Sequence, residues 1–167
     1  MTTSRTARRA GKVGRPGYDL DSLLAAAVKV FNEKGYDGTS MDVLAARLGL
    51  SKSSIYHHVS GKQELLELAL NRALNALFAA TTESGATQGR AIDRLEYLVR
   101  RSVDILSTEL PYVTLLLRGG GNTAGEKRAL ARRREFDEFV GDLVVAAARE
   151  GDIAEGTDPA LVSRLLF

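Results

Sequence analysis

Apolar side chains recur every three to four residues along most of this chain, and that spacing predicts amphipathic helices. The first such stretch covers residues 20–34, with Asp19 before it to cap the start and Gly35 after it to end the helix. No run of residues alternates apolar and polar positions with the β-branched enrichment typical of a strand. The pattern therefore predicts an all-α fold.

Two short helices are expected next, with a tight turn between them. Thr39 and Asp42 have the spacing of a capping box at the start of the first of these helices, and Gly49 ends it. Ser51 can cap the second, which we expect to extend to His57. Two short helices joined by a turn and resting on a longer helix have the arrangement of a helix-turn-helix unit.

Longer helices are expected to form the rest of the chain. Ser60 and Gln63 have the spacing of another capping box, and Asp158 followed by Pro159 marks the start of the last helix. Between these points we expect helices over residues 63–80, 92–106, 112–117 and 130–147, with a polar loop at 81–89 and a helix stop at Pro111.

Charge is distributed unevenly along the chain, and its basic end points to a polyanionic partner. Residues 1–60 carry nine Lys and Arg against five Asp and Glu, whereas residues 61–167 carry 14 against 16. Residues 1–18 contain basic residues and glycines but no acidic residue, so we expect a flexible basic arm there. The chain then divides into this arm, a helix-turn-helix domain at 19–62 and a helical body at 63–167.

The recognition helix is expected to present a small, polar and cationic face. If Ile55 and Val59 point inward, Lys52, Ser53, Tyr56 and His57 lie on the opposite side. A recognition helix enters the major groove with its N-terminus first, which favours base contacts from Lys52 and Ser53. The phosphate contacts then fall to Ser54, Tyr56, His57 and Lys62. The alternative is a plain helical hairpin, in which Tyr56 and the two adjacent histidines pack against the following helix.

Residues 38–66 closely resemble the DNA-binding domain of TetR/AcrR-family regulators, on the sequence GTSMDVLAARLGLSKSSIYHHVSGKQELL. The resemblance implies base contacts from positions 52 and 53 and phosphate contacts from the surrounding polar residues. The Gly14-Arg15-Pro16 segment is similar to a core that lies in narrow minor grooves, with a solvated tail as the alternative. The expected DNA-binding set is Arg15, Thr39, Ser40, Lys52, Ser53, Ser54, Tyr56, His57 and Lys62.

The resemblance also implies that the helical body binds a small-molecule effector and a second copy of the chain. Its last two helices would pair in a four-helix bundle, of which only the first is present, with Leu161, Val162, Leu165 and Leu166 on the dimer side. Because the chain stops inside an apolar helix, we expect either a truncated chain or a helix that docks on a partner. The body would thus serve as a ligand-binding and dimerisation domain.

The family encloses its effector between the helices of the body, and ordinary core is the alternative for each residue of the expected lining. That lining is Leu70, Leu74, Phe78, Tyr97, Arg101, Leu116, Phe136, Phe139 and Val140. It suits a hydrophobic or aromatic effector, such as an acyl or aryl thioester with its phosphates on Arg100, Arg101, Arg118 or the cluster 132–134. Effector binding is expected to move the long helix after the recognition unit and to change the distance between the recognition helices of the two copies.

Other functional classes find little support in the sequence. The Gly-rich loop at 119–127 fails as a phosphate-binding P-loop, because Glu126 separates Lys127 from the last glycine. His57 and His58 cannot share a helix face, the chain has no third histidine, and no Gly-x-Ser-x-Gly is present. We therefore expect no enzyme, no metal and no cofactor. The remaining alternatives are a helical interaction protein that has lost DNA binding and an activator of the same fold.

The composition is that of a cytoplasmic protein with no membrane partner. Cysteine is absent, which excludes disulfides and thiolate metal sites. No run approaches the roughly 18 to 20 apolar residues that a membrane span requires. Taken with the resemblance, the sequence predicts a ligand-responsive repressor that binds a palindromic operator in double-stranded DNA as a homodimer.

Overall fold

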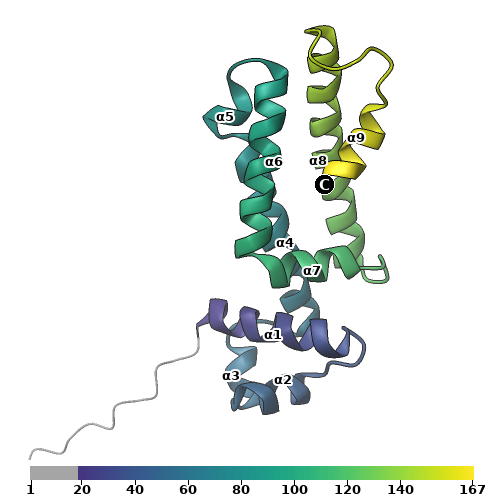
Figure 1. Ribbon diagram of the computed structural model, residues 1–167. Helices are drawn as coiled ribbons and strands as arrows, with labels where there is room; N and C mark the ends of the chain where they lie inside the picture. The colour runs from purple at the N-terminus through teal and green to yellow at the C-terminus, as the bar shows by residue number, and fades with distance from the viewer. Residues whose placement is uncertain (1–18) are drawn as a thin grey trace, which may run out of the picture.

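The computed structural model describes residues 19–167, and it contains helices but no strand over that range. The all-α prediction is confirmed. Figure 1 shows a small N-terminal unit below a taller helical body, with α7 crossing between the two. The elements are α1 (Leu20–Lys34), α2 (Met41–Leu48), α3 (Lys52–Tyr56), α4 (Lys62–Thr81), α5 (Ser84–Thr87), α6 (Ala91–Thr108), α7 (Leu110–Arg118), α8 (Ala124–Arg149) and α9 (Pro159–Leu166).

The N-terminal unit begins as the sequence predicts but differs at the start of α2. Asp19 caps α1 by accepting a hydrogen bond from the Ser22 amide at 2.8 Å. The cap of α2 is Ser40, not Thr39, and the Ser40 hydroxyl accepts from the Val43 amide at 3.2 Å. Thr39 is buried instead, because its hydroxyl donates to the Gly35 carbonyl at 2.7 Å and closes the turn after α1.

The junction between α3 and α4 also differs from the predicted capping box. The structure pairs Ser60 with Glu64 and not with Gln63. The Glu64 carboxylate accepts from the Ser60 amide at 2.6 Å and from its hydroxyl at 2.8 Å, and these bonds lower the pKa of Glu64. The turn is therefore fixed by an ionised carboxylate before α4 begins at Lys62.

In the body, α6 and α8 stand on either side of the molecule, and α4 packs against both (Figure 1). The predicted polar loop after α4 contains one short helix, α5. Helix α6 ends at Thr108, just before Pro111 as predicted, and Pro111 itself lies in the first turn of α7, where no amide donor is needed. Thr123 and Glu126 form a capping box at the start of α8. No helix among the described residues is long and apolar enough to cross a membrane.

One hydrophobic core joins the N-terminal unit to the body. Buried residues of α1, α2 and α3 belong to the same cluster as Leu65, Leu70 and Leu74 of α4 and Leu116 of α7. The boundary predicted after residue 62 is the start of α4, yet the core continues across it. The packing of the body therefore supports the orientation of the N-terminal unit.

We predict that Leu74→Ala destabilises the fold by about 2 to 5 kcal/mol, because Leu74 is fully buried in this shared core. Urea unfolding followed by far-UV circular dichroism measures the free energy of unfolding. Leu110→Ala is the matched control, since Leu110 is 52% exposed and its truncation is expected to change stability by less than about 0.5 kcal/mol. Equal losses for the two variants would contradict the assignment of Leu74 to the core.

Candidate nucleic-acid interface

The recognition helix α3 is held by a single buried side chain and the segment that follows it. Ile55 is completely buried, and Val59 after the helix is 3% exposed, as the sequence predicts. Ser51 caps the helix by accepting from the Ser54 amide at 3.2 Å. With Ile55 pointing inward, Lys52, Ser53 and Tyr56 of α3 face away from the core, and Ser54 is half-buried.

The outward face carries most of the side chains that were expected to contact DNA. Lys52, Ser53, Tyr56 and His57 are all exposed, and Tyr56 is 51% exposed. Ser40, at the start of α2, is also exposed. These exposures contradict the hairpin alternative, in which Tyr56 and both histidines pack against α4. The surface has the size and chemistry of a recognition helix.

Polar contacts organise this face before any DNA is bound. The Lys52 ammonium lies 2.8 Å from an Asp42 carboxylate oxygen, and this hydrogen bond raises the pKa of Lys52. The Ser51 hydroxyl lies within hydrogen-bond distance of the hydroxyls of Ser53 at 3.0 Å and Ser54 at 2.8 Å. Lys52 is thus charged at neutral pH, and its ion pair with Asp42 is a contact that the sequence pattern does not predict.

Two of the expected phosphate ligands point into the protein. The Lys62 ammonium donates to the carbonyl of Tyr36 at 3.0 Å and to that of Thr39 at 2.9 Å, and it lies 4.2 Å from the centre of the Tyr36 ring. Thr39 itself is 1% exposed. A phosphate contact from Lys62 would have to compete with these bonds. Arg15, the remaining candidate, lies outside the described residues.

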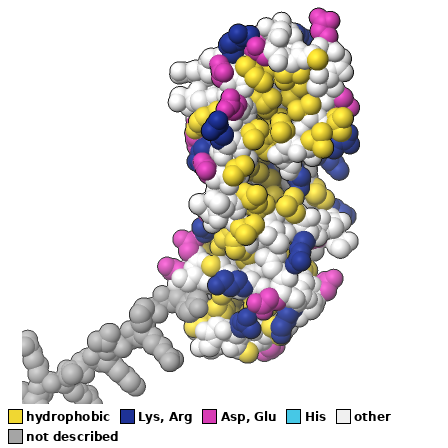
Figure 2. Space-filling view, in the orientation of Figure 1, with side chains coloured by type: hydrophobic (Ala, Val, Ile, Leu, Met, Phe, Trp, Pro, Cys, Tyr) yellow, Lys and Arg dark blue, Asp and Glu magenta, His cyan; other side chains and the backbone are white. Residues whose placement is uncertain are grey.

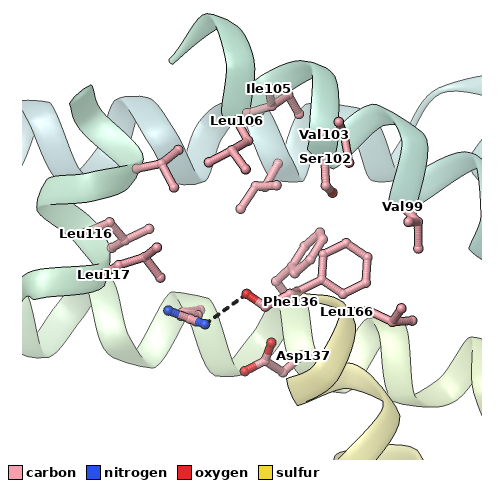
Figure 3. Close-up of a pocket in the computed structure, with 14 residues that line it drawn as sticks. Val99, Ser102, Val103, Ile105, Leu106, Leu116, Leu117, Phe136, Asp137 and Leu166 are labelled. Carbon is pink, nitrogen blue, oxygen red and sulfur yellow. Dashed lines mark hydrogen bonds between the residues drawn. The ribbon is translucent and has the colours of Figure 1, made fainter. Parts of the chain in front are cut away.

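The body contains a cavity of about 170 Å³ between α6, α7, α8 and the end of α9 (Figure 3). Most of its wall is apolar, and it includes Val99, Val103, Leu106, Leu116, Leu117, Phe136 and Leu166. Ser102 also lines it, and its buried hydroxyl has no hydrogen-bond partner among residues 19–167. Arg133 lies at the wall, where its guanidinium donates to the Phe167 carbonyl at 3.1 Å.

The cavity coincides only in part with the predicted lining. Leu116 and Phe136 line it, but Leu70 and Leu74 belong to the shared core. Phe78, Phe139 and Val140 pack within the hydrophobic clusters of the body, and Tyr97 and Arg101 both donate to Glu83. The helical period identifies these residues as inward-facing, but the cavity is lined mainly by α6, α7 and α8, and α4 contributes Leu77 and not the predicted Leu70, Leu74 or Phe78.

Most of the arginines considered for an effector phosphate are bound elsewhere. Arg100 pairs with Glu96 at 2.6 Å, and Arg101 with Glu83 at 3.0 Å. The others have separate partners: Arg118 donates to the Asn32 carbonyl, and Arg132 donates to Asn71 and Asn75. Arg134 lies in a groove between α8 and α9. Arg133 is the member of this set that lines the cavity.

The last helix presents part of the predicted dimer face to solvent. Leu161 is 48%, Leu165 75% and Leu166 41% exposed, and Leu166 also lines the cavity, whereas Val162 packs against the core. Figure 2 shows apolar side chains gathered along this face of the body, between α6 and the α8–α9 pair. The surface thus retains exposed leucines that a partner could cover.

Comparison with known proteins places these features in a family. The model for bacterial regulatory proteins of the tetR family matches residues 23–69, and the model for the tetracyclin repressor-like C-terminal domain matches residues 88–167. The crystal structure of SCO3833, a TetR-family regulator from Streptomyces coelicolor A3, is 57% identical with a TM-score of 0.82, covering 86% of this chain and 71% of that one. The chain belongs to the TetR family of transcriptional regulators.

Other members of the TetR family resemble the chain over different lengths. PfmR from Thermus thermophilus is 29% identical with a TM-score of 0.74, over 86% of this chain and 79% of that chain. The repressor DrrR1 from Streptomyces coeruleorubidus is 42% identical over 67 residues, which are 40% of this chain and 25% of DrrR1. The family consists of regulators and not of enzymes, in agreement with the sequence analysis.

We predict that Lys62→Met lowers the stability of this TetR-family regulator by about 1 to 3 kcal/mol, because two carbonyls of the α1–α2 turn lose their donor. Chemical unfolding without DNA measures the change. Lys29→Met is the control, since the Lys29 side chain is exposed on α1. If both variants kept wild-type stability, the inward role of Lys62 would be contradicted.

Proposed function

We propose that this chain is a ligand-responsive repressor that binds a palindromic operator as a dimer and releases it when a small hydrophobic effector binds. The observation that carries the proposal is the outward presentation of Lys52, Ser53 and Tyr56 by a helix whose Ile55 is fully buried. The repressor assignment is favoured over an activator because DrrR1, a relative across the helix-turn-helix region, is a repressor.

In this proposal α3 enters the major groove with its N-terminus leading. Lys52 and Ser53 occupy the first turn and would reach base edges, where a lysine ammonium favours guanine O6 and N7. Tyr56, His57 and Ser40 are exposed beside them and would donate to phosphates, which fixes the register of the protein on the duplex. Ser54, half-buried and bonded to Ser51, is a weaker candidate.

A palindromic operator requires two recognition helices about 34 to 36 Å apart, and therefore a dimer. The exposed Leu161 and Leu165 on α9 support a contact between two bodies, because an interface there would remove these apolar side chains from water. We infer that α9 forms part of the dimer interface and that α3 of each copy faces the same side of the duplex.

The effector is proposed to enter the cavity between α6, α7, α8 and α9. Its volume of about 170 Å³ is close to that of an apolar protein cavity that accepts benzene. A small acyl or aryl group fits that space, and the Ser102 hydroxyl, which has no partner among residues 19–167, would donate to a carbonyl of the ligand. Arg133 and Asp137 both lie at the wall, and Arg133 is the proposed partner for a negative group beyond the apolar part, such as a coenzyme thioester carries.

Contacts between the body and α1 provide a route from this cavity to the recognition helix. Leu116 and Leu117 of α7 line the cavity. The same helix is bonded to α1, since the Asn32 side-chain amide donates to the Pro111 carbonyl at 2.8 Å and Arg118 donates to the Asn32 carbonyl at 2.9 Å. A ligand that displaces α7 would therefore displace α1 and the helices packed on it. The protein then releases DNA if the ligand binds best to a conformation in which the distance between the two recognition helices does not fit the operator.

Binding to duplexes selected from a random pool tests the DNA-binding part of the proposal. We predict that Tyr56→Ala weakens binding to all duplexes, whereas Lys52→Ala chiefly relaxes base preference, by about 1 to 3 kcal/mol at the base it reads. Lys127→Ala on α8 is the control, because its exposed side chain lies in the body. A wild-type chain that enriches no sequence and binds no duplex would instead favour an interaction protein that has lost DNA binding.

Thioesters of N-acetylcysteamine, which carry an acyl group without the nucleotide, test the effector part. We predict that isovaleryl or benzoyl thioesters raise the melting temperature of the protein and weaken its binding to the selected duplex. Val103→Trp should abolish both effects, because Val103 is 61% exposed at the cavity wall and a larger ring there blocks entry. Leu110→Trp, outside the cavity, should leave them intact. Loss of response in both variants, or in neither, would argue against this cavity as the site.

A further inference from the structure

A carboxylate lies within the face that is proposed to meet DNA. Asp42 is in the first turn of α2, and its side chain is 73% exposed. Its oxygen lies 2.8 Å from the Lys52 ammonium of α3, the group assigned to base contacts. An acidic residue in the first turn stabilises a helix, which accounts for a carboxylate at this position but not for its contact with the recognition helix.

The ion pair with Asp42 is expected to affect Lys52 differently on a duplex with guanine at the contacted position and on one without it. An ammonium group has three donors, so Lys52 can keep its bond to Asp42 and still donate to a guanine edge. On a duplex without guanine at that position, the base edge offers Lys52 at most one acceptor, adenine N7 or thymine O4, and phosphates compete more strongly for the ammonium. A phosphate bound by Lys52 would lie near the Asp42 carboxylate, and the two negative charges repel each other whether or not Lys52 keeps its bond to Asp42. Asp42 therefore disfavours the wrong duplex more than the right one.

We propose that Asp42 is a specificity-determining residue, which holds Lys52 toward the base edges and away from the phosphate backbone. The inference rests on the proposed DNA-binding role of α3. It assigns Asp42 a positioning role that acts through Lys52, without a DNA contact of its own. Its effect is on the ratio of affinities for right and wrong sequences, which a role confined to helix stability would not change.

The test compares the full chain with its Asp42→Asn variant on two probes: the duplex that the wild type selects and a scrambled duplex of the same composition. We expect the variant to bind the scrambled duplex more tightly, and the ratio of the two affinities to fall by roughly two- to five-fold. The salt dependence on the scrambled duplex should steepen by about 0.9 in log–log slope, since Lys52 then neutralises one more phosphate. Asp42→Ser, a second charge-free variant, should give the same ratio.

Two controls separate this role from a general charge effect. Glu33→Gln removes one carboxylate from the 3.0 Å ion pair with Arg47, which joins α1 to α2, and it should leave the ratio unchanged. In a Lys52→Met background, Asp42→Asn should no longer alter the ratio. An unchanged ratio in the single variant, or a change that persists without Lys52, would overturn the inference while DNA binding by the wild type stands. A wild type that binds neither probe would overturn both proposals.

Discussion

The burial of Ile55 is the constraint on which the reading surface depends. Helix α3 is five residues long, far below the roughly 12 to 15 residues at which an isolated helix becomes marginally stable. Its conformation and direction therefore come from packing, with Ile55 fully buried and Val59 fixed just after it. Because Ile55 is the one fully buried position of so short a helix, Lys52, Ser53 and Tyr56 lie on its other faces and are exposed to solvent. The outward orientation of Lys52, Ser53 and Tyr56 thus follows from the burial of one apolar side chain, Ile55.

Ile55 can hold α3 in place because the N-terminal unit shares its hydrophobic core with the C-terminal body. Its core continues into α4 and α7, and polar contacts reinforce the junction. Lys62 bonds the start of α4 to the α1–α2 turn, Asn32 bonds α1 to α7, and Arg72 of α4 pairs with Asp21 of α1 at 3.6 Å. These contacts join α1 to both α4 and α7. They are the basis of the proposed coupling between the effector cavity and α3.

The sequence predicted those features that depend on neighbouring residues. The bounds of α1 follow from Asp19, Gly35 and the apolar period between them, and the structure has them as expected. The predicted cap at Thr39 was wrong because the Thr39 hydroxyl bonds a carbonyl of the preceding turn, so that the neighbouring Ser40 takes its place. The outward face of α3 was predictable once Ile55 was assigned to the core.

Features that depend on distant contacts were not predictable from the pattern. The carbonyls bound by Lys62 belong to residues 23 and 26 positions earlier, and nothing local marks that amine as an internal donor. The helical period showed that Leu70 and Leu74 face inward, but it cannot say which inward faces meet each other and which leave a space. Asp42 and Lys52 lie on different helices, so their ion pair also appears only when the turn between α2 and α3 is folded.

The most direct test of the central claim is methylation protection of guanine N7 on the duplex that the protein selects, since N7 is exposed in the major groove. The account predicts two protected patches, one for each copy of α3, centred about 10 to 10.5 base pairs apart on one face of the duplex. Binding that leaves every guanine N7 open to methylation, or that protects a single patch, would contradict the assignment of α3 as a major-groove reading helix.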